Sequence, residues 1–155
     1  MAFDAFLKIE GIEGESTDKV HPGEIEIQSF SWGVSNTASG PAGGGGGAGK
    51  ASFTDMNFQS ALSKASPNLM LACATGRHSP SATLTCRKSG GGGFEFLKIK
   101  LSDILVSSYQ NGGSAGADVP EDLFSLNFTK IDFLYTVART GETVETQFDL
   151  RENKA

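Results

Sequence analysis

Glycine divides this chain into segments, and that division limits the folds that the chain can adopt. Of its 20 glycines, 14 lie in three clusters, at positions 40–49, 90–93 and 112–116. Glycine has no Cβ atom and loses more conformational freedom on folding than any other residue, so such clusters are typical of loops. The first cluster, Gly40–Gly49, has no side chain that could anchor it in a core. We expect a long protruding loop over residues 35–50, and loops of this length often carry function.

Apolar and polar residues alternate along most of the chain between the glycine clusters. This period of two, with many β-branched and aromatic residues, is typical of half-buried antiparallel strands. About seven or more short strands favour a sandwich or a closed barrel. The alternating segments are Phe3–Ile9, Glu24–Ile27, Thr54–Phe58, Ala82–Cys86, Phe94–Leu101, Ile131–Val137 and Val144–Leu150.

Two of these segments change the side on which their apolar residues fall. Ile25–Ile27 has one parity, Phe30–Trp32 has the opposite one, and a similar change lies within Leu126–Phe133. Such a change implies a bulge, which bends and re-aims a strand. If Phe30 and Trp32 are core residues, Ser29 and Ser31 face outward. The pattern therefore predicts a small polar strand face, suited to close contact with water, cargo or a neighbour.

One helix interrupts the strand pattern at Ser66–Thr75. Ser66 is a favourable N-cap, Pro67 fits the first helical position, and Gly76 stands where a C-terminal glycine belongs. Three apolar positions at helical spacing predict an amphipathic helix lying on a mostly β body. They are Leu69, Ala72 and Cys73.

Charge and length exclude several classes of protein. The 13 Lys and Arg against 18 Asp and Glu give a net charge of −5, so the chain repels phosphate backbones, and we expect no nucleic-acid partner. No segment approaches the ~20 apolar residues of a membrane span, so we expect no membrane insertion. The start, Met1–Asp4, has no basic or apolar signal-peptide region. A length of 155 residues fits one domain, over residues 1–155.

The residue patterns that resemble catalytic or metal sites are incomplete. Gly44–Lys50 approaches a phosphate-binding loop, but Ala51 replaces the required Ser or Thr. Gly112–Gly116 matches the G-x-S-x-G pattern of hydrolases, but no histidine follows position 78. The cysteines and histidines lack zinc-site spacing, and Glu24 with Glu26 reads as a solvated strand face. We therefore expect no enzyme activity, no metal and no cofactor.

Several short segments, weak alone, form a specific set through their order and spacing. They are Phe6–Gly11, Gly14–Ser16, Asp18, His21, Glu24–Ile25, Ser29–Gly33, Gly43–Lys50, Lys64–Pro67, Ala72–Gly76, Arg87–Lys88, Leu97–Ile99, Leu105–Ser108 and Leu126–Phe128. Over nearly its whole length the chain thus resembles Hcp, the haemolysin-coregulated protein family that forms the tube of the bacterial type VI secretion system.

That resemblance implies a fold and an assembly. The fold is a closed antiparallel β-barrel with one short α-helix and a long protruding glycine-rich loop. The assembly is a homohexameric ring, and stacked rings form a tube that ends at a trimeric spike protein. Contraction of a sheath expels the tube, and effector proteins can ride in its lumen. Such proteins are made in the bacterial cytoplasm and secreted without a signal peptide.

The resemblance also implies roles for two sets of residues. Ser29 and Ser31 fall on the segment that lines the lumen. Because the chain stops at Ala155, soon after the last strand, we expect a tube protein without a C-terminal effector domain. The loop residues expected to reach the adjacent ring are Gly43, Gly44, Gly45, Gly46, Gly47 and Lys50.

Two other interpretations remain open at this stage. The glycine-rich loops could be recognition loops of a secreted adaptor that binds a partner, since scaffolds often present function on loops. A hydrolase using Ser114, or a nucleotide enzyme using Lys50, is the third and weakest interpretation. Deletion of Gly43–Gly47 separates the first two, because ring stacking would fail in a tube protein and partner capture would fail in an adaptor.

Overall fold

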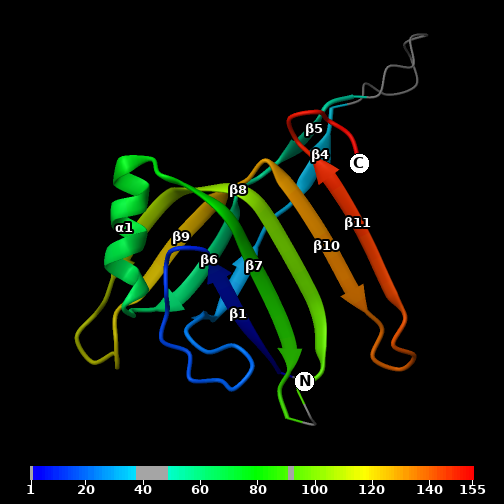
Figure 1. The fold of residues 1–155 in the computed structure, drawn as a ribbon. Coiled ribbons are helices and arrows are strands. Elements are labelled where there is room, and N and C mark those ends of the chain that lie inside the picture. Colours follow the sequence, from blue (N-terminus) through cyan, green and yellow to red (C-terminus); the bar gives the residue numbers. More distant parts are fainter. Residues whose placement is uncertain (1, 38–48, 91–92) are drawn as a thin grey trace.

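Eleven strands and one helix make up the computed structural model, which describes residues 2–37, 49–90 and 93–155 (Figure 1). Their order along the chain is β1 (Phe3–Ile9), β2 (Ile25–Ile27), β3 (Ser29–Ser31), β4 (Val34–Asn36), β5 (Ala51–Phe53), β6 (Met56–Ala61), α1 (Ala65–Thr75), β7 (His78–Lys88), β8 (Glu95–Gly112), β9 (Glu121–Asn127), β10 (Lys130–Thr136) and β11 (Thr143–Asp149). The expected segments of alternating residues are therefore strands.

Nine strands form one antiparallel sheet, and β4 with β5 forms a separate two-stranded ribbon. The sheet order is β2-β1-β7-β8-β9-β6-β3, and β10 joins β8 and carries β11. One edge of β8 pairs with β7, and its other edge pairs first with β10 and then with β9. Because β8 has two successive neighbours on one edge, the sheet divides there into two walls with the core between them (Figure 1).

The closed barrel that we expected is not what the strand pairing forms. The hydrogen-bonded path ends at β2 on one side and at β3 on the other, and these two strands do not pair with each other. They are consecutive in the chain and are separated only by Gln28. The physical reason is that one short segment serves both ends of the sheet: β2 pairs with β1, whereas β3 pairs with β6.

The change of parity predicted in this segment is confirmed. Ile25 and Ile27 are buried, Ser29 and Ser31 are exposed, and Phe30 is half-buried. The Gln28 N–H donates to the carbonyl of Gln59 at 2.8 Å, so the chain changes partner at this residue. The second predicted bulge, within Leu126–Phe133, is wrong because the chain ends β9 there and begins β10.

The core lies between the two walls and consists of aliphatic and aromatic side chains. Phe124 of β9 stacks on Phe58 of β6, with ring centroids 5.2 Å apart, and both rings are almost fully buried. Trp32 is only half-buried, which differs from our expectation of a core residue. It packs at the margin against Phe53 and Phe133, at centroid distances of 6.4 and 5.7 Å.

Helix α1 ends where the sequence predicts, but it begins earlier and with a different N-cap residue. Gly76 has a φ of 67° and its N–H caps carbonyls of the last turn, as predicted. The N-cap is Lys64 and not Ser66. The helix is also less amphipathic than expected, because Met70 and Leu71 lie on its solvent side and are each 50% exposed.

Ser66 turns inward because it serves a buried carboxylate. Its hydroxyl donates to Asp122, which is 1% exposed. The Tyr109 hydroxyl and the Asn111 side-chain amide also donate to the carboxylate of Asp122, each at 2.8 Å. Three hydrogen bonds offset the cost of burying this charge and join α1 to β8 and β9.

Burial predicts different costs for two aromatic truncations. Phe124→Ala should lower the free energy of unfolding by about 3–5 kcal/mol, because it leaves a cavity in the core. Trp32→Ala should cost only about 1–2 kcal/mol in the isolated subunit, because the indole is half-buried there. Urea denaturation, at a protein concentration too low for assembly, measures both. Equal losses would show that Trp32 is buried as deeply as Phe124.

Candidate functional site

Small polar side chains cover the outward side of β3 and of the strand beside it. Ser29 lies opposite Gln59 of β6, and Ser31 lies opposite Asn57. The Ser29 hydroxyl donates to the Gln59 side-chain carbonyl at 3.2 Å. Both serines are exposed in the single chain, with Phe30 turned between them toward the core. This agrees with the outward orientation that the sequence predicted for the two serines.

The same chemistry continues across two further strands. In the strand registers, Gln59 lies opposite Leu123 of β9, and Leu123 lies opposite Gln110 of β8. A second row passes from Asn57 to Ser125 and Ser108. We call this surface the polar face; it comprises Ser29, Ser31, Asp55, Asn57, Gln59, Ser107, Ser108, Gln110, Gly112, Glu121, Leu123, Ser125 and Asn127.

A hydrogen-bonded cluster holds one end of the polar face rigid. The carboxylate of Asp55 accepts from the Ser107 hydroxyl at 2.6 Å and from the Asn127 amide at 2.9 Å. Ser125 exchanges hydrogen bonds with Ser107 and Ser108, at 2.7 and 2.5 Å. Ser107 is the extra residue of a bulge in β8, so the bulge places two adjacent serines against one partner.

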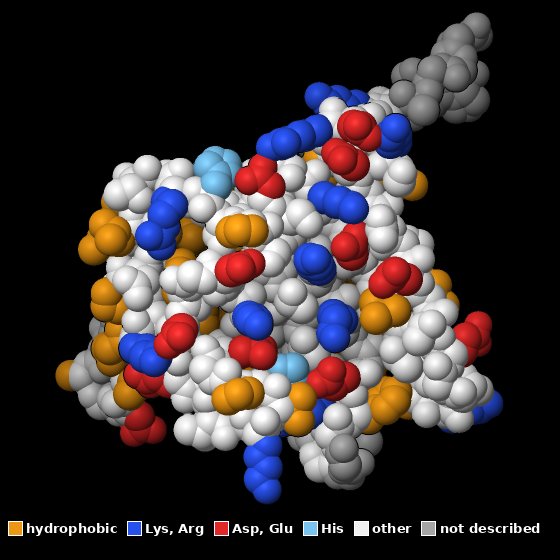
Figure 2. Space-filling view, in the orientation of Figure 1, with side chains coloured by type: hydrophobic (Ala, Val, Ile, Leu, Met, Phe, Trp, Pro, Cys, Tyr) orange, Lys and Arg blue, Asp and Glu red, His pale blue; other side chains and the backbone are white. Residues whose placement is uncertain are grey.

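The polar face is weakly acidic. Asp55 and Glu121 are its only ionisable residues, and Gln59 donates to Glu121 at 2.7 Å. In contrast, the face seen in Figure 2 carries interspersed positive and negative side chains. Lys98 and Lys100 of β8 lie close to Lys8 and Glu10 on the outward side of the sheet. Away from Glu121 and Leu123, this surface of hydroxyls and amides without cations offers few strong attachment points to another protein.

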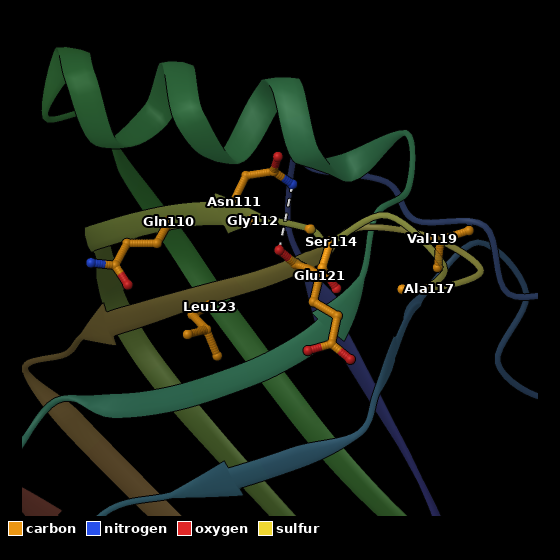
Figure 3. A pocket seen from close by; sticks show the side chains of 9 residues that line it. Gln110, Asn111, Gly112, Ser114, Ala117, Val119, Glu121 and Leu123 are labelled. Carbon is orange, nitrogen blue, oxygen red and sulfur yellow. Dashed lines mark hydrogen bonds between the residues drawn. The ribbon is translucent and has the colours of Figure 1, made fainter.

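A groove of about 800 Å³ opens at the other end of the polar face, where β8 turns into β9 (Figure 3). Gln110 and Leu123 lie on one side of it, and Ala117 and Val119 of the connecting loop lie on the other. The Glu121 side chain stands between them.

Ser114 lies in this groove, but the surroundings are not those of a hydrolase nucleophile. The residues after it form turns, whereas the G-x-S-x-G pattern requires a helix. Neither described histidine lines the groove, since His21 contacts Phe6 and His78 contacts Asp103. The phosphate-loop pattern also lacks its helix, because strand β5 follows Lys50. Among the described residues, no group of three or more His, Cys, Asp or Glu could hold a metal ion.

The ribbon of β4 and β5 extends away from the sheet and forms the base of the expected loop (Figure 1). Its pairing continues to Thr37, whose N–H and hydroxyl both donate to the carbonyl of Lys50. Lys50 is exposed. The predicted stacking residues Gly43, Gly44, Gly45, Gly46 and Gly47 lie outside the described residues.

A charged cluster around His21 fixes the segment between β1 and β2. The imidazole lies 3.0 Å from Glu24 and 2.7 Å from Glu95, and it stacks on Phe6 at a centroid distance of 4.8 Å. On the same ring of Phe6 lies the guanidinium of Arg87, at 5.0 Å.

Arg87 completes this cluster through Asp18. Two hydrogen bonds of 3.0 and 2.7 Å join the guanidinium to the Asp18 carboxylate, and they hold the pKa of that carboxyl well below its usual range. Gly14 allows the close approach of the segment, since a Cβ there would lie 2.5 Å from the Glu24 carbonyl oxygen. The cluster is structural, because its polar groups are satisfied by one another.

Comparison with known proteins identifies the family. The model of the family described as "Type VI secretion system effector, Hcp" matches residues 6–135. The chain is also 43% identical over 159 aligned residues to protein hcp1 of Pseudomonas aeruginosa, covering 99% of this chain and 98% of that protein. The chain belongs to the Hcp family. It is thus a secreted structural protein of type VI secretion, a family not known for enzyme activity.

Solved structures support the same assignment for this Hcp chain. Hcp1 from Salmonella typhimurium is 37% identical and matches with a TM-score of 0.86 over 99% of each chain. A type VI secretion system effector from Yersinia pestis is 31% identical, with a TM-score of 0.79 over 94% of this chain and 99% of that one. None of the described helices is long and apolar enough to cross a bilayer.

Sequence reasoning found part of the polar face of this Hcp chain. It identified Ser29 and Ser31, and the structure adds their neighbours on β6, β8 and β9. Asn57 and Gln59 could have been found, because they alternate with Met56 and Phe58. Ser108 and Gln110 could not, because the bulge at Ser107 shifts the register of β8.

His21 makes the stability of this Hcp chain depend on pH. Burial alone would lower the pKa of His21, but hydrogen bonds to Glu24 and Glu95 outweigh burial and raise the pKa above its usual 6.5. The folded state therefore binds this proton more tightly than the unfolded chain. The stabilisation is fully present below about pH 6.5 and is lost as the pH rises through the folded-state pKa.

We therefore expect a higher free energy of unfolding at about pH 6 than at about pH 8, measured by urea denaturation. His21→Gln should flatten this dependence. Glu26→Gln is the control, because Glu26 is exposed on β2 and the hydrogen bonds of His21 go to Glu24 and Glu95, so this substitution should leave the dependence unchanged. A wild-type protein with no pH dependence in this window would contradict the role of His21.

Proposed function

We propose that this Hcp chain forms homohexameric rings that stack into the expelled tube of a type VI secretion system, with effector proteins carried in the lumen. The observation that carries the proposal is the polar face, which spans four strands and carries hydroxyls, amides and two carboxylates. In the proposal this face, with Ser29 and Ser31, lines the lumen. The whole chain, residues 1–155, acts as one domain, is made in the cytoplasm and leaves it without a signal peptide.

Contacts between neighbouring subunits are assigned to an apolar strip. The strip comprises Phe3, Phe96, Leu97, Tyr135 and Val144. Tyr135 lies opposite Leu97 on one side and Val144 on the other, and Phe3 packs edge-to-face on Phe96 at 5.9 Å. Tyr135 and Val144 are 44% and 54% exposed in the single chain. Phe3 is also exposed, whereas Phe96 and Leu97 are half-buried. Exposed apolar side chains beside a half-buried apolar margin are typical of a protein interface, where their burial stabilises assembly.

The ribbon supplies the contact between rings in this proposal. It extends from the sheet (Figure 1) and leads to the exposed Lys50, one of the expected stacking residues; the others, Gly43–Gly47, lie outside the described residues. At the tip of the tube the partner is the trimeric spike protein, and the outer partner is the sheath.

A charge placed in the apolar strip should prevent ring formation. Size-exclusion chromatography with light scattering should give the wild type a mass near six times 16.2 kDa, and Val144→Glu should give the mass of one subunit. Val20→Glu is the matched control, because Val20 is 66% exposed but lies outside the strip. A wild type that stays monomeric at high concentration, or a Val144→Glu variant that assembles normally, would contradict the proposal.

Deletion of Gly43–Gly47 should separate ring formation from ring stacking. The deletion variant should form rings of normal mass, because the apolar strip lies elsewhere. It should lose the stacked particles that the wild type forms, as seen by negative-stain microscopy. Stacking that is unaffected would show that the loop has another role, and the adaptor interpretation would then become the leading one.

A further inference from the structure

The groove beside the β8–β9 connection has the size of a binding site. Its volume of about 800 Å³ falls within the range of about 300–1,000 Å³ that is typical of ligand sites. It shares Gln110, Gly112, Glu121 and Leu123 with the polar face, so it opens onto that surface. The loop between Gly112 and Val119 forms its far side (Figure 3).

The chemistry of the groove is apolar on two sides and acidic between them. Val119 and Leu123 are each 48% exposed and face each other across the depression. Glu121 is the only ionisable residue that lines the groove. No lysine or arginine is among the lining residues, so the negative charge is not neutralised by a cation there.

Two features leave room for a second chain. Within the described part of the protein, the amide of Gln110 makes no side-chain hydrogen bond, so its donor and acceptor are open to a ligand. Gly112, directly opposite Glu121 in the strand register, has no heavy atom within 4 Å of where a Cβ would stand. The floor of the groove is therefore bare backbone that a peptide can approach closely.

Asn111, unlike Gln110 and Gly112, is not available to a ligand. Its amide turns toward α1 and donates to Asp122 at 2.8 Å, and also to the Glu121 carbonyl. It thus fixes the start of β9, so that the Glu121 side chain stands in the groove on a rigid strand. The Glu121 carboxylate accepts one hydrogen bond, from Gln59, and its other oxygen has no such bond among the described residues.

We propose that this groove binds an extended peptide segment of a cargo protein, in which a lysine or arginine is flanked by apolar residues. The cationic side chain pairs with Glu121, and the apolar side chains contact Val119 and Leu123. The peptide backbone lies over Gly112, within reach of the Gln110 amide. The peptide chemistry follows from the groove itself; that the segment belongs to a cargo rests on the proposed function.

Direct binding of short peptides tests this proposal. The probe is a fluorescein-labelled pentapeptide with the sequence glycine–leucine–arginine–leucine–glycine, and fluorescence anisotropy measures its affinity. The matched peptide has glutamate in place of arginine and should bind at least about fivefold more weakly. Binding of both peptides with equal affinity would overturn the assigned role of Glu121.

Two variants of the protein locate the binding. Glu121→Gln should weaken the arginine peptide about threefold to fivefold, the range expected for an exposed ion pair. Gly112→Leu should weaken it more than about tenfold by filling the floor, and the φ of Gly112 is not in the left-handed region, so leucine is tolerated. Glu142→Gln, an exposed carboxylate outside the groove, should bind like the wild type.

Light scattering on the same samples separates this proposal from the proposed function. Intact rings that show no saturable binding at about 1 mM peptide would contradict peptide binding in the groove but would leave the proposed tube function unaffected. Specific binding by a protein that never forms rings would support the groove and contradict the tube. A loss of affinity in Glu142→Gln equal to that in Glu121→Gln would overturn the groove, because binding would then follow net charge alone.

Discussion

One long strand, β8, is the element on which the rest of the fold depends. Its 18 residues pair with β7 on one edge and with β10 and then β9 on the other. A straight strand of that length would be about 60 Å long, too long for a domain of this size. It bends at Asp103, whose φ is 49°, and again at the bulge of Ser107. The two bends turn one strand into both walls around the core.

Side-chain contacts surround the first of these bends. Asp103 lies 3.3 Å from His78 at the start of β7 and also contacts Arg151 in the C-terminal turn. A positive φ is costly for a residue with a side chain, although aspartate tolerates it better than most. The contacts on both sides hold Asp103 in this conformation and connect three parts of the chain that are distant in sequence.

The sequence alone predicts the elements of this fold better than their arrangement. Alternation places seven strand segments correctly, and in most of them one face is buried in the same core; β11 is the exception, since its residues are exposed or half-buried. Alternation does not show that β8 is one continuous strand, since the apolar period shifts at each bend. It also does not show that β2 and β3 stay unpaired, which leaves the barrel open. Ser66 illustrates a second limit. Its type and position favour an N-cap, but only the fold shows that the buried carboxylate of Asp122, 56 residues away, takes its hydroxyl.

The candidate site, too, could be predicted only in part from the sequence. The outward orientation of Ser29 and Ser31 follows from local parity, which a strand pattern carries. The extent of the polar face does not, because it depends on the registers of four strands and on the bulge at Ser107. The groove is even harder to predict from the sequence, because Val119, Glu121 and Gln110 meet only where a glycine-rich turn folds β9 back beside β8.

The C-terminal turn has a consequence for how this protein can be labelled. Asn153 accepts a hydrogen bond from the N–H of Ala51 at 3.4 Å, so the end of the chain lies against the root of the ribbon (Figure 1). The start of β1 lies at the opposite end of the molecule. A fluorescent protein or affinity tag fused after Ala155 would emerge beside the ribbon and crowd it, whereas a tag placed before Phe3 would emerge far from it.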